Sequence, residues 1–544
     1  MSSQTAHVDL FARDNLPPPE QQPEFLFELP ELKFPERINC ATELLDRHVD
    51  SGRGDRICVK VPGEPGWTYA QLRDKADRIA HVLVDDMGLV PGNRVLLRAF
   101  NKPMMVACWF AVMKAGGIAV ATMPLLRAKE LGQIIAKGQV SHALCDQALR
   151  EELETAAGQF PQLAQMRCFG DPSPQGLDAL MQRHTRAFAN VDTAADDCCL
   201  FGFTSGTTGQ PKATMHFHRD VMAACLCFPP HVLRATPDDV FIGSPPLAFT
   251  FGLGGLTLFP MHIGASTVLI EKASPAALLD AIVAERATVL FTAPTSYRAM
   301  ADRARERGIA VEHGGSLRKC VSAGEALPAA TRAEWREATG IEMIDGIGST
   351  ELLHIFVSAD EAHARPGATG VAVPGYRAVV MDDDGKPAAP GVIGKLAVKG
   401  PTGCRYLDDP RQAQYVKDGW NYTGDAYLVD DDGYFHYQSR TDDMIVSSGY
   451  NIGAPEVEEA LLLHPAVADC AVIGIADYQR GQIVKAFVVL APGHRGDEAM
   501  VRTLQEHVKS SVAPYKYPRE IEFREAMPRT ETGKLQRFRL RPPA

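Results

Sequence analysis

The sequence of 544 residues has no unbroken membrane-length apolar run, no pair of cysteines at metal-binding spacing and no excess of positive charge. The most apolar stretch, residues 104–126, contains Lys114 and the Gly116-Gly117 break, which argues against a membrane span. The N-terminal residues lack a basic segment followed by an apolar core, so no secretory signal is expected. We therefore expect a cytoplasmic protein that does not associate with membranes.

The twelve cysteines stand singly or in close pairs, and none belongs to a Cys-x-x-Cys arrangement. This excludes the common zinc-binding patterns and favours reduced thiols in a reducing compartment. The formal net charge of -11 disfavours binding to nucleic acid. The apolar fraction is ordinary for a globular protein, and the chain is too long for one compact core, so at least two domains are expected.

From about residue 35 the chain alternates between helical patterns and short apolar runs. Buried strands are predicted over residues 94–99, 118–120, 240–244, 267–270, 288–291 and 319–322. A helix is predicted over 275–285, because Ser274 suits the N-cap and Pro275 the first turn. Its apolar stripe consists of Leu278, Leu279, Ile282 and Val283. This alternation predicts an α/β fold with mostly parallel sheets.

After about Gly391 short strands and turns predominate, and they predict a small barrel-like part of the large N-terminal domain. A small α+β unit follows, with helices predicted at 456–463 and 498–512 and strands at 467–473 and 485–490. We place the boundary between a domain of residues 1–440 and a domain of residues 441–544.

One short loop, TSGTTGQPK, combines the features that phosphate binding requires, and it follows an apolar strand. Glycines let backbone N–H groups approach an anion, hydroxyl groups add donors, and a lysine adds positive charge. A flexible surface loop is the alternative, but it explains neither the lysine nor the strand that anchors the loop. The candidate phosphate contacts are Thr204, Ser205, Gly206, Thr207, Thr208, Gly209 and Lys212.

This loop resembles the phosphate-binding loop of the adenylate-forming superfamily, which includes acyl- and aryl-CoA ligases, luciferases and adenylation domains of peptide synthetases. Four further segments match that family in the same order: GSTE at 348–351, YTGD at 422–425, RTDD at 440–443 with Gly449, and PRTETGK at 528–534. The resemblance implies a ligase that uses ATP and Mg²⁺ to adenylate a carboxylic acid and then transfers the acyl group to coenzyme A.

The resemblance also implies roles for individual nucleotide contacts. Glu351 and Thr207 correspond to the Mg²⁺ site, and Thr350 corresponds to a phosphate contact. A carboxylate beside a triphosphate is repelled unless a cation lies between them, which supports the Mg²⁺ role, although a turn-capping glutamate is the alternative for Glu351 alone. The remaining implied contacts are Gly324, Glu325, Ala326, Asp345 and Gly346 on the adenine side, and Asp425 and Arg440 at the ribose.

Three residues of the C-terminal unit take their roles from the same resemblance. Lys534 corresponds to the adenylation lysine. Two unit charges 4 Å apart repel by about 4 kcal/mol at an effective dielectric near 20, and a cation between carboxylate and phosphate removes this cost. Asp442 corresponds to the hinge about which the mobile unit swings between an adenylation pose and a thioester-forming pose. Gly449 corresponds to the lining of the pantetheine tunnel in the second pose.

The run DGIGSTELLHIF resembles the benzoate-CoA ligase branch, and the runs TAHVDLFARDNLPPPEQ and SPPLAFTFGLGG most resemble 2-aminobenzoate-CoA ligases. They imply an aromatic acid as substrate and a pocket formed by Thr250, Phe251, Gly348, His354 and Ile355. His354 is suited to donate a hydrogen bond to the substrate carboxylate. A histidine buried in the core for packing is the alternative, and the residues alone do not separate the two.

Several other functions share the first half-reaction or the fold. They are a stand-alone adenylation enzyme that loads a carrier protein, a benzoate- or salicylate-CoA ligase, a catalytically silent nucleotide-binding protein and a luciferase-type oxygenase. No Asp-Ser carrier attachment site follows Arg541, which favours free coenzyme A. The presence of Lys212, Glu351 and Lys534 argues against a silent protein. A homodimer is compatible with a chain of this size.

Overall fold

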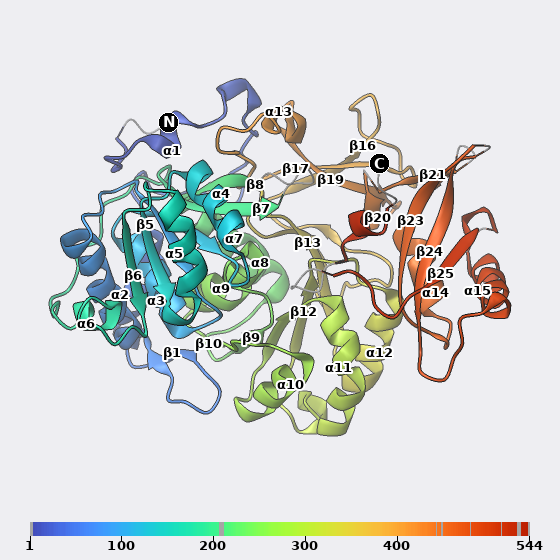
Figure 1. Cartoon of the computed structure of the whole chain (residues 1–544), viewed down its shortest axis with the longest axis horizontal. Helices are drawn as coiled ribbons and strands as arrows, with labels where there is room; N and C mark the ends of the chain where they lie inside the picture. Colours follow the sequence, from blue (N-terminus) through green and yellow to red (C-terminus); the bar gives the residue numbers. More distant parts are fainter. Residues whose placement is uncertain are drawn as a thin grey trace.

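The computed structural model describes residues 4–205, 211–441, 443–447, 450–478, 480–512, 514–529 and 535–541. Over these ranges the chain forms four sheets with helices packed around them (Figure 1). None of the helices in these ranges is both long and apolar enough to cross a membrane. All twelve cysteines are free thiols with buried side chains.

The first sheet has the order β6-β5-β3-β4-β7-β8, in which only β8 runs antiparallel to its neighbour. Helix α3 packs on β3 and β4, α2 packs on α3, and α4 packs on α5 and β8. The strands are β3 (Arg94–Arg98), β4 (Ile118–Thr122), β5 (His142–Asp146), β6 (Gln165–Phe169), β7 (Cys198–Ser205) and β8 (Pro211–Phe217). The helices are α2 (Tyr69–His81), α3 (Pro103–Lys114), α4 (Ala128–Gly138), α5 (Arg150–Gln159), α6 (Leu177–Met181) and α7 (His218–Phe228).

The second sheet has the order β15-β14-β13-β12-β11-β9-β10-β1-β2, and its six central strands from β13 to β1 are parallel. The strands are β1 (Ile57–Lys60), β2 (Trp67–Thr68), β9 (Val240–Gly243), β10 (Ser266–Val268), β11 (Val289–Thr292), β12 (Lys319–Ala323), β13 (Met343–Gly348), β14 (Ile355–Ser358) and β15 (Val371–Ala372). The associated helices are α8 (Thr250–Leu253), α9 (Phe259–Ile263), α10 (Pro275–Ala284), α11 (Pro294–Arg307) and α12 (Ala329–Thr339).

Helix α10 illustrates how local sequence sets an element. Ser274 caps it by accepting a hydrogen bond from the backbone N–H of Ala277, as predicted. Leu278, Leu279 and Ile282 are buried, but Val283 is 49% exposed. Val283 lies about 140° around the helix from Leu278, at the edge of the buried stripe. The predicted stripe was therefore one residue too wide.

The third sheet is antiparallel and corresponds to the predicted barrel-like part. Its strands are β16 (Arg377–Met381), β17 (Gly394–Lys399), β18 (Val416–Lys417), β19 (Trp420–Val429) and β20 (Phe435–Arg440), with α13 (Gln412–Tyr415) beside it.

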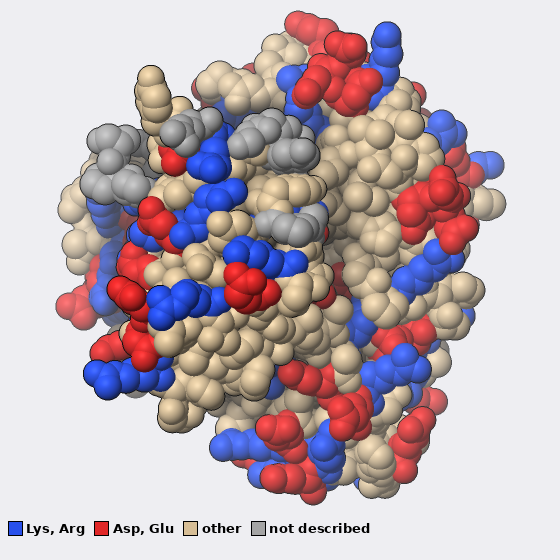
Figure 2. Space-filling view, turned by 90° about the vertical axis from the view of Figure 1, so that its right-hand side faces the viewer, with Lys and Arg blue, Asp and Glu red and all other residues tan. Residues whose placement is uncertain are grey.

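The fourth sheet lies wholly in the C-terminal unit, at the right of Figure 1, and has the order β22-β21-β24-β23 with β25 beside β24. Its strands are β21 (Ile445–Ser447), β22 (Tyr450–Ile452), β23 (Val467–Asp477), β24 (Gly481–Leu490) and β25 (Glu520–Phe523), packed with α14 (Ala454–Leu462) and α15 (Glu498–Ser511). Acidic and basic side chains are interspersed on the face that Figure 2 shows.

Candidate functional site

The phosphate side of the candidate site begins at the β7–β8 hairpin. Thr204 and Lys212 are cross-strand partners, so the two strands hold the ends of the predicted loop together. The Thr204 hydroxyl is buried, and no described group within 3.5 Å pairs with it. Gly206, Thr207, Thr208 and Gly209 lie outside the described residues, and their phosphate roles stay predictions.

Lys212 forms a triangle with a carboxylate and a phenol from distant parts of the chain. Its Nζ donates to Glu351 Oε1 at 2.7 Å and lies 2.5 Å from Tyr406 Oη. The Tyr406 hydroxyl donates to the same Glu351 oxygen at 2.6 Å. The structure thus brings together two predicted nucleotide contacts, Lys212 and Glu351, that are far apart in the sequence.

The Glu351 carboxylate is buried but held in its charged form. Burial opposes ionisation, yet the Lys212 charge and the hydrogen bonds from Lys212 and Tyr406 lower its pKa below the ordinary value. A single ionised carboxylate facing a phosphate-binding loop fits Mg²⁺, which proteins usually bind through one or two carboxylates together with substrate phosphates. Glu351 would hold the ion from the protein side.

Two residues that the sequence analysis did not single out support this triangle. Tyr406 carries no motif by which it could have been recognised. Gly202 lies within β7, and a Cβ there would come 2.6 Å from the Thr350 side chain, so glycine lets the 350–351 segment pack against the strand. An isolated glycine inside a strand is a recognised sign of close approach, and this one could have been noticed.

On the adenine side, the predicted residues meet where the carboxyl end of β12 lies beside the middle of β13. Gly324, Glu325 and Ala326 directly follow β12, while Asp345 and Gly346 pair with the last residues of that strand. Burial raises the pKa of Asp345 to about 7, although the Arg332 charge opposes the shift. This edge of a parallel sheet is where α/β proteins commonly bind ligands.

The two predicted ribose contacts are direct partners across β19 and β20. Arg440 Nη1 donates to Asp425 Oδ1 at 2.9 Å. Gly424 has a φ of 78°, and a Cβ there would lie 2.6 Å from the Arg440 guanidinium. Glycine at this position therefore permits both the left-handed backbone conformation within β19 and the close pairing.

The C-terminal unit approaches the adenine-side loop. Arg529 Nη1 lies 3.5 Å from Glu325 Oε1, and Arg529 Nη2 donates to Asp469 Oδ1 at 2.9 Å. The backbone N–H of Ala329, at the start of α12, donates to Glu459 of α14 at 3.1 Å. Lys534, Asp442 and Gly449 lie outside the described residues.

The predicted acid-pocket residues meet near the ends of β13 and α8. Gly348 and Ile355 are cross-strand partners, and Thr250 and Phe251 begin α8. His354 precedes β14 and is only 4% exposed. Its ring is surrounded by four phenyl rings, with centroid distances of 4.5 to 6.5 Å: Phe228, Phe251, Phe259 and Phe291.

The His354 imidazole is neutral and lacks ordinary hydrogen bonds. Among the described groups, none makes a hydrogen bond with either ring nitrogen. Burial lowers its pKa to about 3, and the nearby Phe251 carbonyl opposes the shift only in part. A buried polar ring with no partner beyond a poorly aligned Phe251 carbonyl is costly in a folded protein, and a bound ligand would relieve that cost. Gly254 is essential to this packing, because a Cβ there would lie 2.3 Å from His354 Cδ2.

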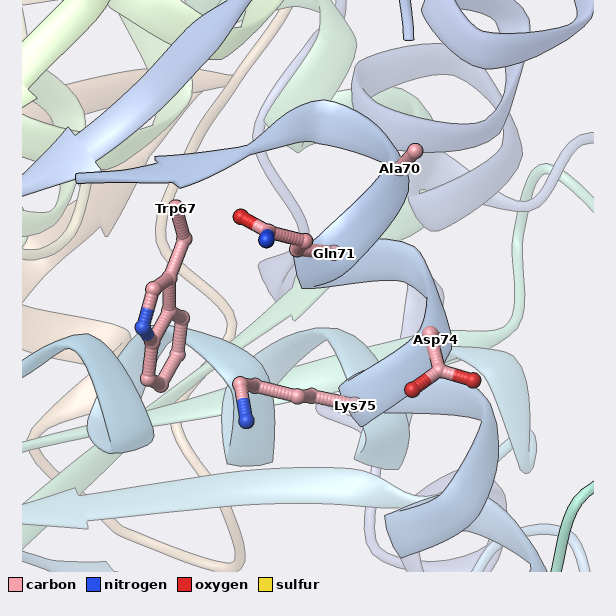
Figure 3. A pocket seen from close by; sticks show the side chains of 5 residues that line it. All are labelled: Trp67, Ala70, Gln71, Asp74 and Lys75. Atoms are coloured by element: carbon pink, nitrogen blue, oxygen red, sulfur yellow. The ribbon is translucent and has the colours of Figure 1, made fainter. Parts of the chain in front are cut away.

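One hollow of the molecule, with a volume of about 420 Å³, is separate from these residues. It is lined by Trp67, Ala70, Gln71, Asp74 and Lys75 on β2 and α2 (Figure 3). Lys75 Nζ there lies 4.6 Å from the Trp67 ring centroid. The lining of this hollow includes none of the predicted site residues. We therefore define the candidate site by the predicted side chains that lie close together, and not by this hollow.

Family comparisons agree with this arrangement. Residues 45–405 match the family described as AMP-binding enzyme, and residues 456–534 match the AMP-binding enzyme C-terminal domain. The chain belongs to the AMP-binding enzyme family. The predicted resemblance to the adenylate-forming superfamily is therefore confirmed, and so is the fold expected from it.

Relatives of this AMP-binding enzyme point to one branch of the family. The benzoate–CoA ligase of Thauera aromatica is 35% identical over 519 residues, covering 94% of this chain and 97% of the relative. The crystal structure of the anthranilate CoA ligase AuaEII in complex with anthranoyl-AMP has a TM-score of 0.87 at 33% identity, covering 94% and 98%. A benzoate CoA ligase from Burkholderia xenovorans LB400 has a TM-score of 0.84 at 28% identity, covering 93% and 100%. These similarities support the benzoate-CoA ligase branch.

Proposed function

We propose that this AMP-binding enzyme is an ATP-dependent aryl-CoA ligase whose preferred acid is 2-aminobenzoate. The substrate carboxylate attacks the α-phosphate of ATP, forming the aryl-adenylate and releasing pyrophosphate. The thiol of coenzyme A then attacks the acyl carbon, forming the thioester and releasing AMP. The observation that carries the proposal is the aromatic enclosure of the unpaired His354, three residues from Glu351.

The enclosure favours a flat aromatic acid over a long aliphatic one. Lys and Arg are absent from the proposed pocket residues Thr250, Phe251, Gly348, His354 and Ile355. A neutral His354 donates one N–H to the substrate carboxylate and orients it before attack. The Thr250 hydroxyl, or a nearby carbonyl, meets a small polar group in the ortho position. The solved relative that holds anthranoyl-AMP, the adenylate of 2-aminobenzoate, supports this preference.

The Lys212–Glu351 pair serves the nucleotide. We infer that, when ATP binds, the Lys212 ammonium leaves the Glu351 carboxylate and contacts a phosphate oxygen instead. Glu351 and Thr207 would then be ligands of Mg²⁺. The ion, when bound, neutralises triphosphate charge. Thr204 and Thr350 add contacts to the phosphates, and the pair formed by Asp425 and Arg440 faces the ribose.

The second half-reaction requires the C-terminal unit, residues 441–544, to move. The contact between Arg529 and Glu325 supports an adenylation pose, because it brings the segment that precedes Lys534 to the adenine-side loop. In the other pose Gly449 lines the path of the pantetheine arm, and Asp442 is the hinge. We also propose a cytoplasmic location, supported by twelve free thiols.

An acid panel with and without coenzyme A tests this function. AMP release should be fastest with 2-aminobenzoate, slower with benzoate and 2-hydroxybenzoate, and negligible with hexanoate or longer acids, in each case only when coenzyme A is present. Faster turnover of hexanoate than of any benzoate would contradict the aryl-acid assignment. Equal AMP release without coenzyme A, or transfer to a carrier protein alone, would contradict the CoA ligase.

A further inference from the structure

A cluster of two histidines and an aspartate lies far from the candidate active site. His81 is the last residue of α2, and Asp85 lies in the π-helical turn η5 (Val82–Asp86) that continues it. His184 follows α6, which packs against α2 and η5. Figure 1 shows α2 and α6 together at the left edge of the molecule, opposite the C-terminal unit.

The three side chains converge on one point. His81 Nδ1 lies 2.9 Å from Asp85 Oδ2, and His184 Nδ1 lies 3.9 Å from the same oxygen. One ligand atom from each residue lies within 4.8 Å of the other two. The two imidazole rings are stacked, with centroids 5.2 Å apart and planes 10° from parallel. His81 is buried, while Asp85 opens the cluster to solvent.

The outer ring nitrogens determine which tautomers fit. His184 Nε2 lies 2.8 Å from Asp86 Oδ2, and His81 Nε2 lies 3.4 Å from the Ala187 carbonyl. A carboxylate and a carbonyl only accept hydrogen bonds, so His184 Nε2 carries a proton and His184 Nδ1 presents a lone pair toward Asp85. His81 has an acceptor beside each ring nitrogen, Asp85 Oδ2 at 2.9 Å and the Ala187 carbonyl at 3.4 Å, and one neutral tautomer can donate to only one of them.

Protonation of His81 alone would satisfy its two acceptors but would leave the His184 Nδ1 lone pair facing the Asp85 carboxylate. Charging both rings would place two cations in stacked rings, which repel each other. Arg186 Nη2 lies 3.5 Å from Asp85 Oδ2, and its side chain is 74% exposed. A single divalent cation in the place of the His81 Nδ1 proton would take both Nδ1 lone pairs and the Asp85 oxygen as ligands, and would leave the His81 Nε2–H to donate to Ala187.

We propose that His81, Asp85 and His184 bind one late first-row divalent cation of the Zn²⁺ class. Imidazole nitrogen and carboxylate oxygen are ordinary ligands of such ions, and water completes the coordination. Asp86 and the Ala187 carbonyl orient the two rings from outside, as carboxylates and carbonyls commonly do at metal sites. The ion clamps the end of α2 to the segment after α6 and does not depend on the ligase reaction.

The test uses the full chain stripped of metal, titrated with Zn²⁺ by calorimetry and with Co²⁺ by absorption. We expect one Zn²⁺ per chain with a Kd below 1 µM, a rise of the unfolding temperature by a few degrees, and Co²⁺ bands without thiolate charge transfer. His184→Gln and Asp85→Asn should each weaken binding at least tenfold and abolish the thermal shift. His231→Gln, which alters another surface histidine paired with a carboxylate, should change neither.

Three outcomes would overturn the proposal. They are the absence of Zn²⁺ binding, binding that neither variant weakens, and a Co²⁺ thiolate band. The last would assign the ion to Cys40, Cys199 and His218, a buried trio that also has metal-ligand chemistry. Ligase activity is measured in parallel and should be the same for the variants and the parent, because the cluster shares no residue with the candidate active site.

Discussion

Two ionisable side chains only three residues apart occupy opposite electrostatic environments. Glu351 is buried but kept charged by Lys212 and Tyr406, whereas His354 is buried among phenyl rings and kept neutral. The first group suits a cation and a triphosphate, and the second suits a single hydrogen bond to a carboxylate. A short segment between β13 and β14 thus supplies both halves of the proposed site.

His354 is expected to contribute through its N–H rather than through its size. Both His354→Phe and His354→Ala should lower kcat/KM for every aromatic acid about 10- to 100-fold, as expected for a lost hydrogen bond to a charged group. Because the pKa of His354 is about 3, this residue should add no inflection to the pH profile between pH 5 and 8. The measurement is kcat/KM of His354→Phe across the acid panel. Values equal to those of the wild type would mean that His354 only packs in the core.

Replacing Lys212 with a neutral residue should lower the free energy of unfolding, because the charged Glu351 carboxylate is buried. Lys212→Met leaves the buried Glu351 carboxylate without a cation, with the Tyr406 hydroxyl as its remaining donor, and the expected loss of stability is about 3 kcal/mol at pH 7. The lowered pKa of Glu351 contributes stability above its ordinary value of 4.5, and this contribution is lost as pH falls through the folded pKa. The gap between variant and parent should therefore shrink as pH falls below 4.5.

Thermal unfolding from pH 7 down to well below pH 4.5 measures that gap. Lys395→Met is the matched control, because Lys395 pairs with the exposed Asp383 at the surface and its loss should cost little at any pH. A stability loss in Lys212→Met that is independent of pH would mean that Glu351 is not the group responsible.

At the scale of elements, close approaches between segments position the site. Gly202 lets the 350–351 segment rest on β7, and Gly254 lets the helical turn after α8 rest on His354. Gly254→Ala should push His354 out of place and reduce kcat/KM for the acid at least tenfold, with little change in the KM for ATP. Gly158→Ala in α5 is the control, because a Cβ there meets nothing within 4 Å and should be neutral or slightly stabilising. If the two substitutions changed kcat/KM for the acid equally, Gly254 would have no specific role in positioning His354.

The sequence alone predicted the positions of those elements that are determined by neighbouring residues in the chain. The apolar runs at β3, β11 and β12 and the Ser274 cap of α10 lie where predicted, within about a residue. Strands β23 and β24 extend further than predicted because they pair with each other along most of their length, and pairing is not visible in either strand alone. Tyr406 was missed for the same reason: its contacts with Lys212 and Glu351 are set by tertiary packing.

For the whole molecule, we propose that adenylate formation and thioester formation use different residues of the same C-terminal unit. Lys534→Ala should slow adenylate formation about 10²- to 10³-fold, as for the loss of one preorganised charge, and spare thioester formation from preformed adenylate. Asp442→Pro should have the reverse effect, because proline fixes φ and would hold one pose if Asp442 is the hinge that we propose. Each variant is the control for the other. Equal damage to both half-reactions in either variant, measured separately, would contradict the division of roles.

The most direct test of the central claim is a single-turnover experiment with 2-aminobenzoate, ATP and Mg²⁺, analysed by mass spectrometry before and after coenzyme A is added. We expect 2-aminobenzoyl-AMP to accumulate to about one equivalent per active site, and coenzyme A then to convert it to the thioester with matching release of AMP. Failure to form the adenylate from any benzoate, or an adenylate that coenzyme A does not consume, would contradict an aryl-CoA ligase.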